Sequence, residues 1–317
     1  MKVGVIGFGA MGKNHVRVLC EMPQISVVIV YETNPDITVS GEKTERAASL
    51  EELVSKGPEY VVVSLPTEHH RDVAIFLADR CIPVLLEKPV ATNLAQAAEI
   101  SEAFNAARTL CTVGHVERFN PSLSALKKKI EEGVLGEIFQ IATRRVGPYP
   151  GRVKDVGVGL DLASHDLDLV TWITGCDYSS LRALTSSPLT SKHQDLFLGV
   201  GELTNGTLVS HEVNWLTPAK ERTTRVLGEH GMLVADSLLA ELRFFESGYA
   251  GSDWGMYSNL RGVTEGQEIR FFVPVREPLL QEHEAMIDEL TAPGSTGIAS
   301  LEDGVRVLQT LERVLND

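Results

Sequence analysis

Cysteine is scarce in this chain of 317 residues, and its four copies, Cys20, Cys81, Cys111 and Cys176, lie far apart. None of them forms the Cys-x-x-Cys pair that is typical of zinc sites and redox centres. Their scattered positions also do not outline a disulfide framework. We therefore expect no metal site, and we expect the protein to work in a reducing, cytoplasmic compartment.

Long apolar runs and clusters of positive charge are missing as well. No stretch approaches the roughly 18 apolar residues of a membrane helix, and the apolar start, Met1–Gly7, is too short for a signal peptide. The formal net charge is -14, and two glutamates, Glu131 and Glu132, come one residue after the basic run Lys127–Lys129. Because nucleic-acid binding requires clustered Lys and Arg, the sequence predicts neither a nucleic-acid nor a membrane partner.

A glycine-rich turn opens the chain between two apolar, β-branched runs. Lys2–Ile6 is typical of a buried strand, and Gly7-Phe-Gly-Ala-Met-Gly12 follows it directly. Asn14–Met22 has the apolar spacing of a helix, and Ile25–Tyr31 resembles a second strand that ends at Glu32. A strand, a glycine turn, a helix and a strand, with an acid about 20 residues after the glycines, together indicate dinucleotide binding.

Each of these residues has a physical task in such a turn. The first glycine permits the tight turn, the second lets a pyrophosphate approach the backbone, and the third allows helix and strand to pack closely. Glu32 would accept hydrogen bonds from the adenosine ribose and repel a 2′-phosphate, so NAD is expected rather than NADP. The residues assigned to the cofactor here are Gly7, Phe8, Gly9, Ala10, Met11, Gly12 and Glu32.

Further strands alternate with helices and predict a doubly wound parallel sheet. Strands are expected at Tyr60–Leu65, Pro83–Leu86 and Leu110–Val113, with helices at about 72–80 and 94–107 between them. Ligands bind at the carboxyl ends of such strands. His115 follows the last of these strands, and for this residue a structural role is as good an interpretation as cofactor contact. The further cofactor contacts expected at this edge are Pro66, Thr67, His70, Glu87, Lys88 and His115.

The pattern changes near residues 114–121, and strands with alternating polarity become frequent. Asn205-Gly206 is a strong hairpin signal between two of them. We therefore predict a Rossmann domain at residues 1–118 and an α+β domain with a large, mostly antiparallel open sheet at 119–317. The last helix, at about 301–315, could pack back on the first domain. Because an uncovered apolar sheet face must find a partner, we expect a homodimer or homotetramer through this sheet.

One stretch of the second domain contains several ionisable side chains close together in the sequence. Asp161 and His165 are four residues apart in a segment of helical apolar spacing, so both would lie on one helix face. A carboxylate beside an imidazole can fix a tautomer and raise the basicity of a proton acceptor. The alternative is a capped and charged helix. Asp166 and Asp168, in the same stretch, are expected to serve the helix face or its packing.

Several motifs together resemble the family of glucose–fructose oxidoreductase, inositol dehydrogenase and MocA-like dehydrogenases. The resemblance spans essentially the whole chain and is more specific for the fold than for the substrate. The motifs that carry it are Gly7–Gly12, Pro66–His70, Glu87-Lys88-Pro89, Gly114–Pro121 and Asp161–His165.

The resemblance implies roles for particular residues. Lys88 matches the family lysine that lies near the nicotinamide and bonds the reacting hydroxyl. Asp161 and His165 match the pair that contacts substrate, with the histidine as proton acceptor. We therefore assign catalysis to Lys88, Asp161 and His165. The residues assigned to substrate binding are Arg118, Tyr149, Arg152, Asp161 and His165.

Within the family, residues 144–152 and 155–161 most resemble nucleotide-sugar 3-dehydrogenases of the UDP-N-acetylglucosamine type. Arg144, Arg145, Arg152 and Lys154 either supply charge for such a substrate or form salt bridges in an acidic protein. An inositol or free-sugar dehydrogenase, or a regulator that binds dinucleotide without turnover, are the alternatives. The Glu-Lys-Pro segment and the Asp/His pair argue against a methyltransferase.

Overall fold

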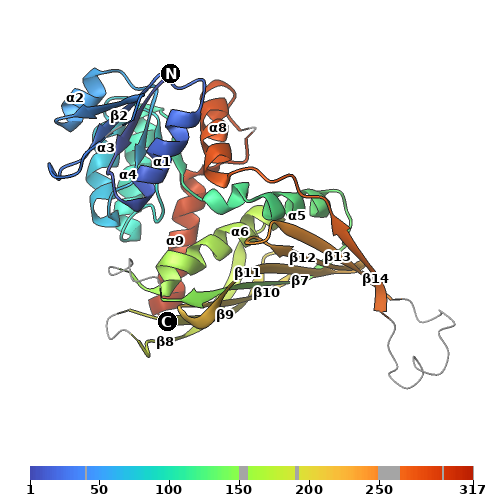
Figure 1. The fold of residues 1–317 in the computed structure, drawn as a ribbon. Helices are drawn as coiled ribbons and strands as arrows, with labels where there is room; N and C mark the ends of the chain where they lie inside the picture. The colour runs from blue at the N-terminus through green and yellow to red at the C-terminus, as the bar shows by residue number, and fades with distance from the viewer. Residues whose placement is uncertain (40, 150–155, 190–192, 249–264, 295, 317) are drawn as a thin grey trace, which may run out of the picture. The chain divides into compact units, whose positions relative to one another are not determined.

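The computed structural model describes residues 1–39, 41–149, 156–189, 193–248, 265–294 and 296–316 (Figure 1). Contacts divide the chain into two compact units. Unit 1 comprises Met1–Val116 and Glu277–Glu312, and unit 2 comprises Glu117–Arg276 and Arg313–Asp317. Compared with the sequence prediction, the boundary lies two residues earlier, and a C-terminal segment of about 36 residues belongs to the first unit.

Unit 1 contains a seven-stranded sheet in the order β15-β6-β5-β4-β1-β2-β3. Its strands pair in parallel except β15, which is antiparallel to β6. The predicted doubly wound parallel sheet is confirmed, whereas β3 and β15 were not predicted. The strands are β1 (Lys2–Ile6), β2 (Val27–Tyr31), β3 (Thr44–Ala47), β4 (Tyr60–Val63), β5 (Val84–Leu86), β6 (Cys111–Val113) and β15 (Ala299–Ser300).

Helices cover the strands of unit 1, and α8 packs beside α1 (Figure 1). The central strands β1, β4 and β5 are buried along almost their whole length, as expected for a parallel sheet covered on both faces. The helices are α1 (Ala10–Glu21), α2 (Leu50–Ser55), α3 (His70–Ala78), α4 (Leu94–Ala107), α8 (Pro278–Thr291) and α9 (Leu301–Asn316), of which α9 belongs to unit 1 as far as Glu312, with a short 3-10 turn, η1 (Thr67–His69).

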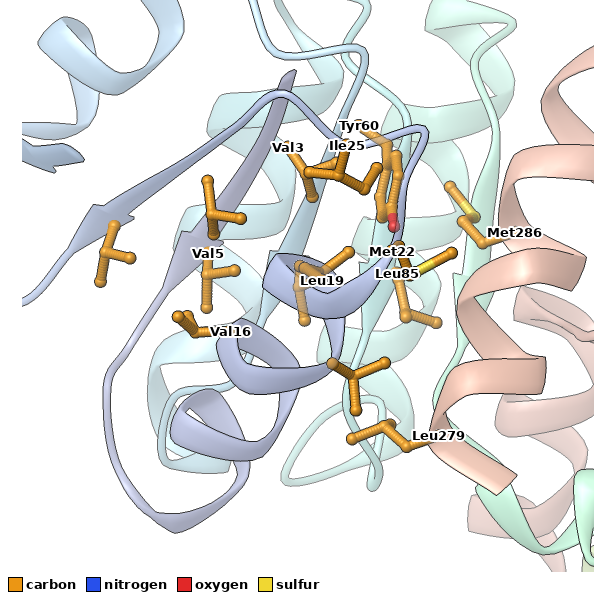
Figure 2. Close-up of a cluster of buried hydrophobic side chains, with 14 of the residues drawn as sticks. Val3, Val5, Val16, Leu19, Met22, Ile25, Tyr60, Leu85, Leu279 and Met286 are labelled. Carbon is orange, nitrogen blue, oxygen red and sulfur yellow. The ribbon is translucent and has the colours of Figure 1, made fainter. Parts of the chain in front are cut away.

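One apolar cluster joins the start of the chain to its C-terminal part. Figure 2 shows Leu19 of α1, and Met22 directly after this helix, beside Tyr60 of β4 and beside Leu279 and Met286 of α8. Fully burying a large apolar side chain contributes about 1.5–3 kcal/mol, so this cluster stabilises the packing of α8 against the Rossmann sheet.

Unit 2 contains an eight-stranded sheet in the order β14-β13-β12-β11-β7-β10-β9-β8. All neighbours are antiparallel except β10 and β7. The predicted hairpin at Asn205-Gly206 joins β9 to β10, and Gly206 has the positive φ of 86° that favours glycine. The strands are β7 (Ile138–Pro148), β8 (Tyr178–Ser186), β9 (Leu196–Leu203), β10 (Leu208–Asn214), β11 (Leu216–Gly228), β12 (Gly231–Asp236), β13 (Glu241–Ser247) and β14 (Glu265–Phe271).

Helices α5 (Pro121–Glu131) and α6 (Ser164–Thr174) lie over one face of this sheet (Figure 1). The other face carries exposed apolar side chains on neighbouring strands, so the open face predicted from the sequence is present. Its exposed apolar residues include Leu184, Leu198, Val200, Leu208 and Leu227. In the part of the chain that the structure describes, no helix is long and apolar enough for a membrane span.

A buried histidine beneath the helices makes the stability of unit 2 depend on pH. The His211 ring nitrogens lie 2.8 Å from Thr143 Oγ1 and 3.0 Å from Tyr178 OH. Burial lowers the pKa of His211 to about 4, whereas an unfolded histidine titrates near pH 6.5. Between these values the unfolded chain binds more protons, so acidification through this range removes up to about 3 kcal/mol of stability.

We expect the melting temperature to fall between pH 6.5 and 4 and to fall less steeply in a His211→Gln variant. Calorimetric scans of both proteins across this range would measure the difference. His70 and His283 also have lowered pKa values, so only the difference between the two slopes reports on His211. Equal slopes in the two proteins would refute this expectation.

Candidate active site

The glycine turn after β1 has the geometry of a phosphate cradle. Gly7 has a φ of +91° and its N–H donates to Tyr31 O at 2.9 Å. A Cβ on Gly12 would lie 2.0 Å from Gly7 O, so only glycine lets α1 approach the strand this closely. A Cβ on Gly9 would meet nothing within 4 Å, and no side chain caps the first turn of α1. The turn therefore has open space and unused N–H donors where a pyrophosphate would bind.

Glu32, at the end of β2, faces this turn. Its Oε2 accepts from Phe8 N–H at 2.8 Å and its Oε1 from Asn34 N–H at 2.9 Å. Burial acts to raise the pKa of Glu32, but these N–H donors outweigh it and leave the pKa below its usual value. Arg46 donates to the carbonyl oxygens of Glu32 and Ile37, at 3.0 and 2.9 Å, and so holds the following loop. The residues present fit a dinucleotide.

The sheet order places this turn at a switch point. Strands β4 and β2 lie on either side of β1, so the chain proceeds in opposite directions from β1, and ligands bind outside the carboxyl ends at such a point. Pro66 and Thr67 follow β4, Lys88 follows β5, and His115 follows β6 and is almost fully buried. The predicted carboxyl-edge positions are therefore brought together on neighbouring strands.

Two of the residues predicted to contact the cofactor have side chains that contact the protein backbone. His70 is fully buried, and its ring nitrogens lie 2.9 Å from Leu65 O and 3.0 Å from Pro89 O. Its side chain therefore joins the end of β4 to the Lys88-Pro89 turn. Glu87 is also buried, and its carboxylate accepts from the Lys88 N–H at 3.2 Å. Their side chains hold the backbone on which Lys88 is placed.

In unit 2, Asp161 lies in a single π-helical turn, Gly159–Ala163, that leads directly into α6. His165 is the second residue of α6, so the predicted helical segment is present, with a π turn at its start. Ser164 N–H donates to Gly159 O, the hydrogen bond that defines the wider turn. Asp161 is 8% exposed and His165 is half-buried. Such turns occur often at functional sites.

Two buried arginines hold α6 in place. Arg145 Nε donates to Asp166 Oδ1 at 2.8 Å and its Nη1 to Glu117 Oε1 at 3.0 Å. Arg118 Nε donates to Asp168 Oδ2 at 2.9 Å. Burial lowers the pKa of the Arg145 guanidinium, but Asp166 and Glu117 outweigh it and raise the pKa above its usual value. Both arginines therefore position the helix that carries His165.

The remaining predicted substrate residues differ in what surrounds them. Tyr149 is 40% exposed and stacks edge-on against Trp215 at 5.6 Å. Arg144 lies within 3.1 Å of Glu221 and 3.5 Å of Glu212, which matches the salt-bridge interpretation. Arg152 and Lys154 lie outside the described residues. The described residues contain no group of three or more His, Cys, Asp or Glu side chains arranged to hold a metal ion.

Two models of one protein family match successive parts of the chain. Residues 1–115 match the oxidoreductase family with an NAD-binding Rossmann fold, and residues 123–234 match the GFO/IDH/MocA C-terminal domain. The chain belongs to the GFO/IDH/MocA oxidoreductase family.

Relatives within the GFO/IDH/MocA family have several activities. The chain is 25% identical over 194 residues to the rhizopine catabolism protein MocA of Rhizobium meliloti, covering 58% of this chain and 61% of that protein. It is 24% identical over 248 residues to UDP-N-acetylglucosamine 3-dehydrogenase of Acidithiobacillus ferrooxidans, covering 78% of each. It is 28% identical over 227 residues to inositol 2-dehydrogenase 2 of Saccharopolyspora erythraea, covering 67% of this chain and 66% of that enzyme. Two of these three matches thus span less than two thirds of the relative.

Solved structures of GFO/IDH/MocA proteins share the fold over nearly the whole chain. The UDP-N-acetylglucosamine 3-dehydrogenase of Acidithiobacillus ferrooxidans has a TM-score of 0.83 at 23% identity, covering 99% of this chain and 96% of that one. The WlbA dehydrogenase of Bordetella pertussis, solved with NADH and UDP-GlcNAcA, has a TM-score of 0.80 at 21% identity. This match covers 100% of this chain and 94% of that one.

Arg222 lies near predicted substrate residues of unit 2, and the sequence did not reveal it. It lies on β11 opposite Arg145, half-buried on the face that α6 covers, and its Nη1 donates to Val146 O at 2.6 Å. Burial and the Arg145 charge lower the pKa of Arg222, whereas the nearby Asp166, Glu117 and Asp161 act to raise it. No local motif marks this position, because its proximity to Asp161 comes from sheet pairing alone.

Proposed function

We propose that this protein is an NAD-dependent dehydrogenase that transfers hydride between the nicotinamide and a ring hydroxyl of a sugar or nucleotide sugar, at C3. The observation that carries the proposal is the arrangement of unit 1, where the open glycine turn and Lys88 lie at the same edge of the sheet. Membership of an oxidoreductase family whose models match successive parts of the chain supports it.

Bound NAD would accept the hydride that leaves the carbinol carbon. The backbone of Gly7–Gly12 would bind its pyrophosphate, and Glu32 would accept hydrogen bonds from the adenosine ribose. Because the pKa of Glu32 is lowered, its carboxylate is ionised at neutral pH and would repel a 2′-phosphate. We therefore propose NAD rather than NADP as the cofactor.

The chain's own residues would manage the hydroxyl proton. As the carbonyl forms, the His165 imidazole takes the proton from the hydroxyl oxygen, and the Lys88 ammonium stabilises the negative charge that develops on this oxygen. Asp161 orients the imidazole or the substrate. In the reverse direction the same groups return the proton to the oxygen, so both directions conserve protons and charge.

For the substrate, we propose a nucleotide sugar of the UDP-N-acetylglucosamine type. The similarity to UDP-N-acetylglucosamine 3-dehydrogenase supports this choice, because it extends over 78% of each chain. Arg222 supplies a cation near Asp161 for an anionic group of the substrate. The similarity to an inositol 2-dehydrogenase supports a cyclitol as the second candidate substrate.

The test is NADH formation across a panel of UDP- and dTDP-sugars, sugar phosphates, free sugars and inositols, with NADP as a parallel cofactor. We expect turnover with NAD and a UDP-sugar, and borodeuteride trapping should place the new carbonyl at C3. Activity only with inositols would support the second candidate. A protein whose melting temperature NAD raises, but which oxidises no member of the panel, would support a non-catalytic regulator.

We also propose that two or four copies associate through the open sheet face of unit 2. Leu184 and Val200 are 78% and 64% exposed there, on neighbouring strands. Apolar side chains gathered on one face favour association. A monomeric mass in sedimentation at micromolar concentration would contradict this.

A further inference from the structure

A buried chain of polar side chains runs through unit 1 and ends next to Lys88. Tyr60 OH lies 2.9 Å from His283 Nδ1, and His283 Nε2 lies 3.0 Å from His15 Nδ1. His15 Nε2 in turn lies 2.9 Å from Glu87 Oε1. The first three side chains are fully buried and Glu87 is 8% exposed. They come from β4, α8, α1 and the end of β5, so four elements contribute one group each.

We propose that this chain, Tyr60–His283–His15–Glu87, is a positioning device that orients Lys88. The inference rests on the proposed function, because it gives Lys88 a role in the reaction. It goes beyond that function because none of Tyr60, His283 and His15 is expected to touch cofactor or substrate.

Hydrogen-bond chemistry gives the chain a single direction. An ionised Glu87 can only accept, so His15 Nε2 carries the hydrogen of this bond. At the other end, the Tyr60 hydroxyl donates to His283 Nδ1, and a neutral His283 then donates from Nε2 to His15 Nδ1. With the opposite direction, the Tyr60 hydrogen would have no acceptor among the described residues.

The protonation states agree with this direction. Burial lowers the pKa of His283 well below its usual value, which keeps the ring neutral. Burial also raises the pKa of Tyr60, so the phenol keeps its hydrogen. Burial acts to raise the pKa of Glu87, but its hydrogen-bond and charge interactions with His15, and then the Lys88 charge, outweigh burial and lower the pKa, so Glu87 stays ionised.

The chain acts on Lys88 through the backbone. Glu87 Oε2 accepts the Lys88 N–H at 3.2 Å, and His70 lies 3.0 Å from Pro89 O on the other side. A Cβ on Gly114 would lie 3.1–3.2 Å from the Glu87 carboxylate, so the carboxylate is backed closely by the next strand end. A Glu87 carboxylate held this firmly would fix the backbone of Lys88, and with it the position from which the Lys88 side chain extends.

The far end of the chain is closed, which favours positioning over proton conduction. Tyr60 lies within the apolar cluster of Met22, Leu85 and Met286 (Figure 2). Neighbouring Glu282 is fully buried, and neither of its carboxyl oxygens has a hydrogen-bond partner among the described residues. Burial and the Glu87 charge raise the pKa of Glu282 well above its usual value, so it stays protonated. A proton that reached Tyr60 would have no outlet to water.

Two substitutions test the proposal through turnover. Tyr60→Phe removes the donor that sets the direction, and His15→Leu leaves the Glu87 carboxylate without its partner. We expect kcat to fall about tenfold in both, with KM for substrate and NAD within about twofold of wild type. His15→Gln, whose amide can donate to Glu87, should restore most of kcat. Tyr178→Phe, which loses a Tyr–His bond of the same kind in unit 2, is the matched control and should keep wild-type kcat.

A second readout needs no turnover. Two-bond proton–nitrogen spectra of ¹⁵N-histidine-labelled protein without NAD should show His15 and His283 as neutral Nε2–H tautomers. An Nδ1–H tautomer at either ring would overturn the proposal. Wild-type kcat in both Tyr60→Phe and His15→Leu, beside an inactive Lys88→Ala, would overturn this inference and leave the proposed function standing. An active Lys88→Ala would overturn this inference together with the catalytic role given to Lys88, while the dehydrogenase activity itself would stand.

Discussion

Lys88→Ala and His165→Ala are each expected to lower turnover at least about a hundredfold. Loss of a positioned general base costs typically about 10²–10⁴ in rate, and loss of a charge that stabilises a developing alkoxide costs about as much. Lys88 is half-buried after β5 and His165 is half-buried at the start of α6, so truncating either side chain leaves the packed core intact. Initial rates with NAD and the best substrate of the panel measure the effect.

Exposed residues of the same types provide matched controls. Lys128 on α5 and His230 in the turn between β11 and β12 are both exposed. Their alanine variants should keep wild-type turnover, and all four variants should keep wild-type melting temperatures. NAD binding by His165→Ala should be unchanged, which separates a loss of chemistry from a loss of cofactor. Near-normal turnover in both Lys88→Ala and His165→Ala would refute the assignment.

Gly9→Ala and Gly12→Ala are expected to fail in different ways although they are three residues apart. A methyl group on Gly9 meets nothing within 4 Å, and the φ of −71° suits alanine, so the fold should keep its melting temperature. The methyl group would instead occupy the space that a pyrophosphate needs. Overpacking costs about 1–3 kcal/mol, which corresponds to roughly fivefold to 140-fold weaker binding of NAD.

Gly12→Ala tests the packing of the same turn. Its methyl group would lie 2.0 Å from Gly7 O, so α1 would have to move, and unit 1 should be destabilised even without NAD. In an ordinary helix, by contrast, Gly→Ala is stabilising by about 1 kcal/mol. Thermal scans with and without NAD separate the two outcomes. Wild-type NAD affinity in Gly9→Ala would show that the cradle is not where the pyrophosphate binds.

Local patterns were enough to predict most of the elements that surround the site. The glycine spacing and the β-branched runs predicted β1, β2, β4, β5 and β6 in their places, and the Asn-Gly pair predicted the hairpin of unit 2. Strands such as β3 and β13 were missed because charged residues interrupt their apolar pattern. These strands form because their backbone groups pair with a neighbouring strand, and the local sequence does not indicate this pairing.

Side-chain roles at the strand ends could be predicted less well than the positions. His70 and Arg118 are polar residues in the expected motifs, and both were assigned to ligands. In the structure, His70 lies against backbone carbonyl oxygens and Arg118 bonds Asp168 beneath α6. A polar side chain at a strand end can point outward or inward, and only the packing around it decides which.

The sequence by itself determined the cofactor turn, the Lys88 position and the helical Asp161/His165 segment, because each depends on rules that act within a few residues. The tertiary structure alone decided that His283, 268 residues after His15, completes the hydrogen-bond chain behind Glu87. It also decided that Arg222 lies near Asp161. Buried donors and acceptors must be paired, and their partners are whichever side chains the fold brings within reach.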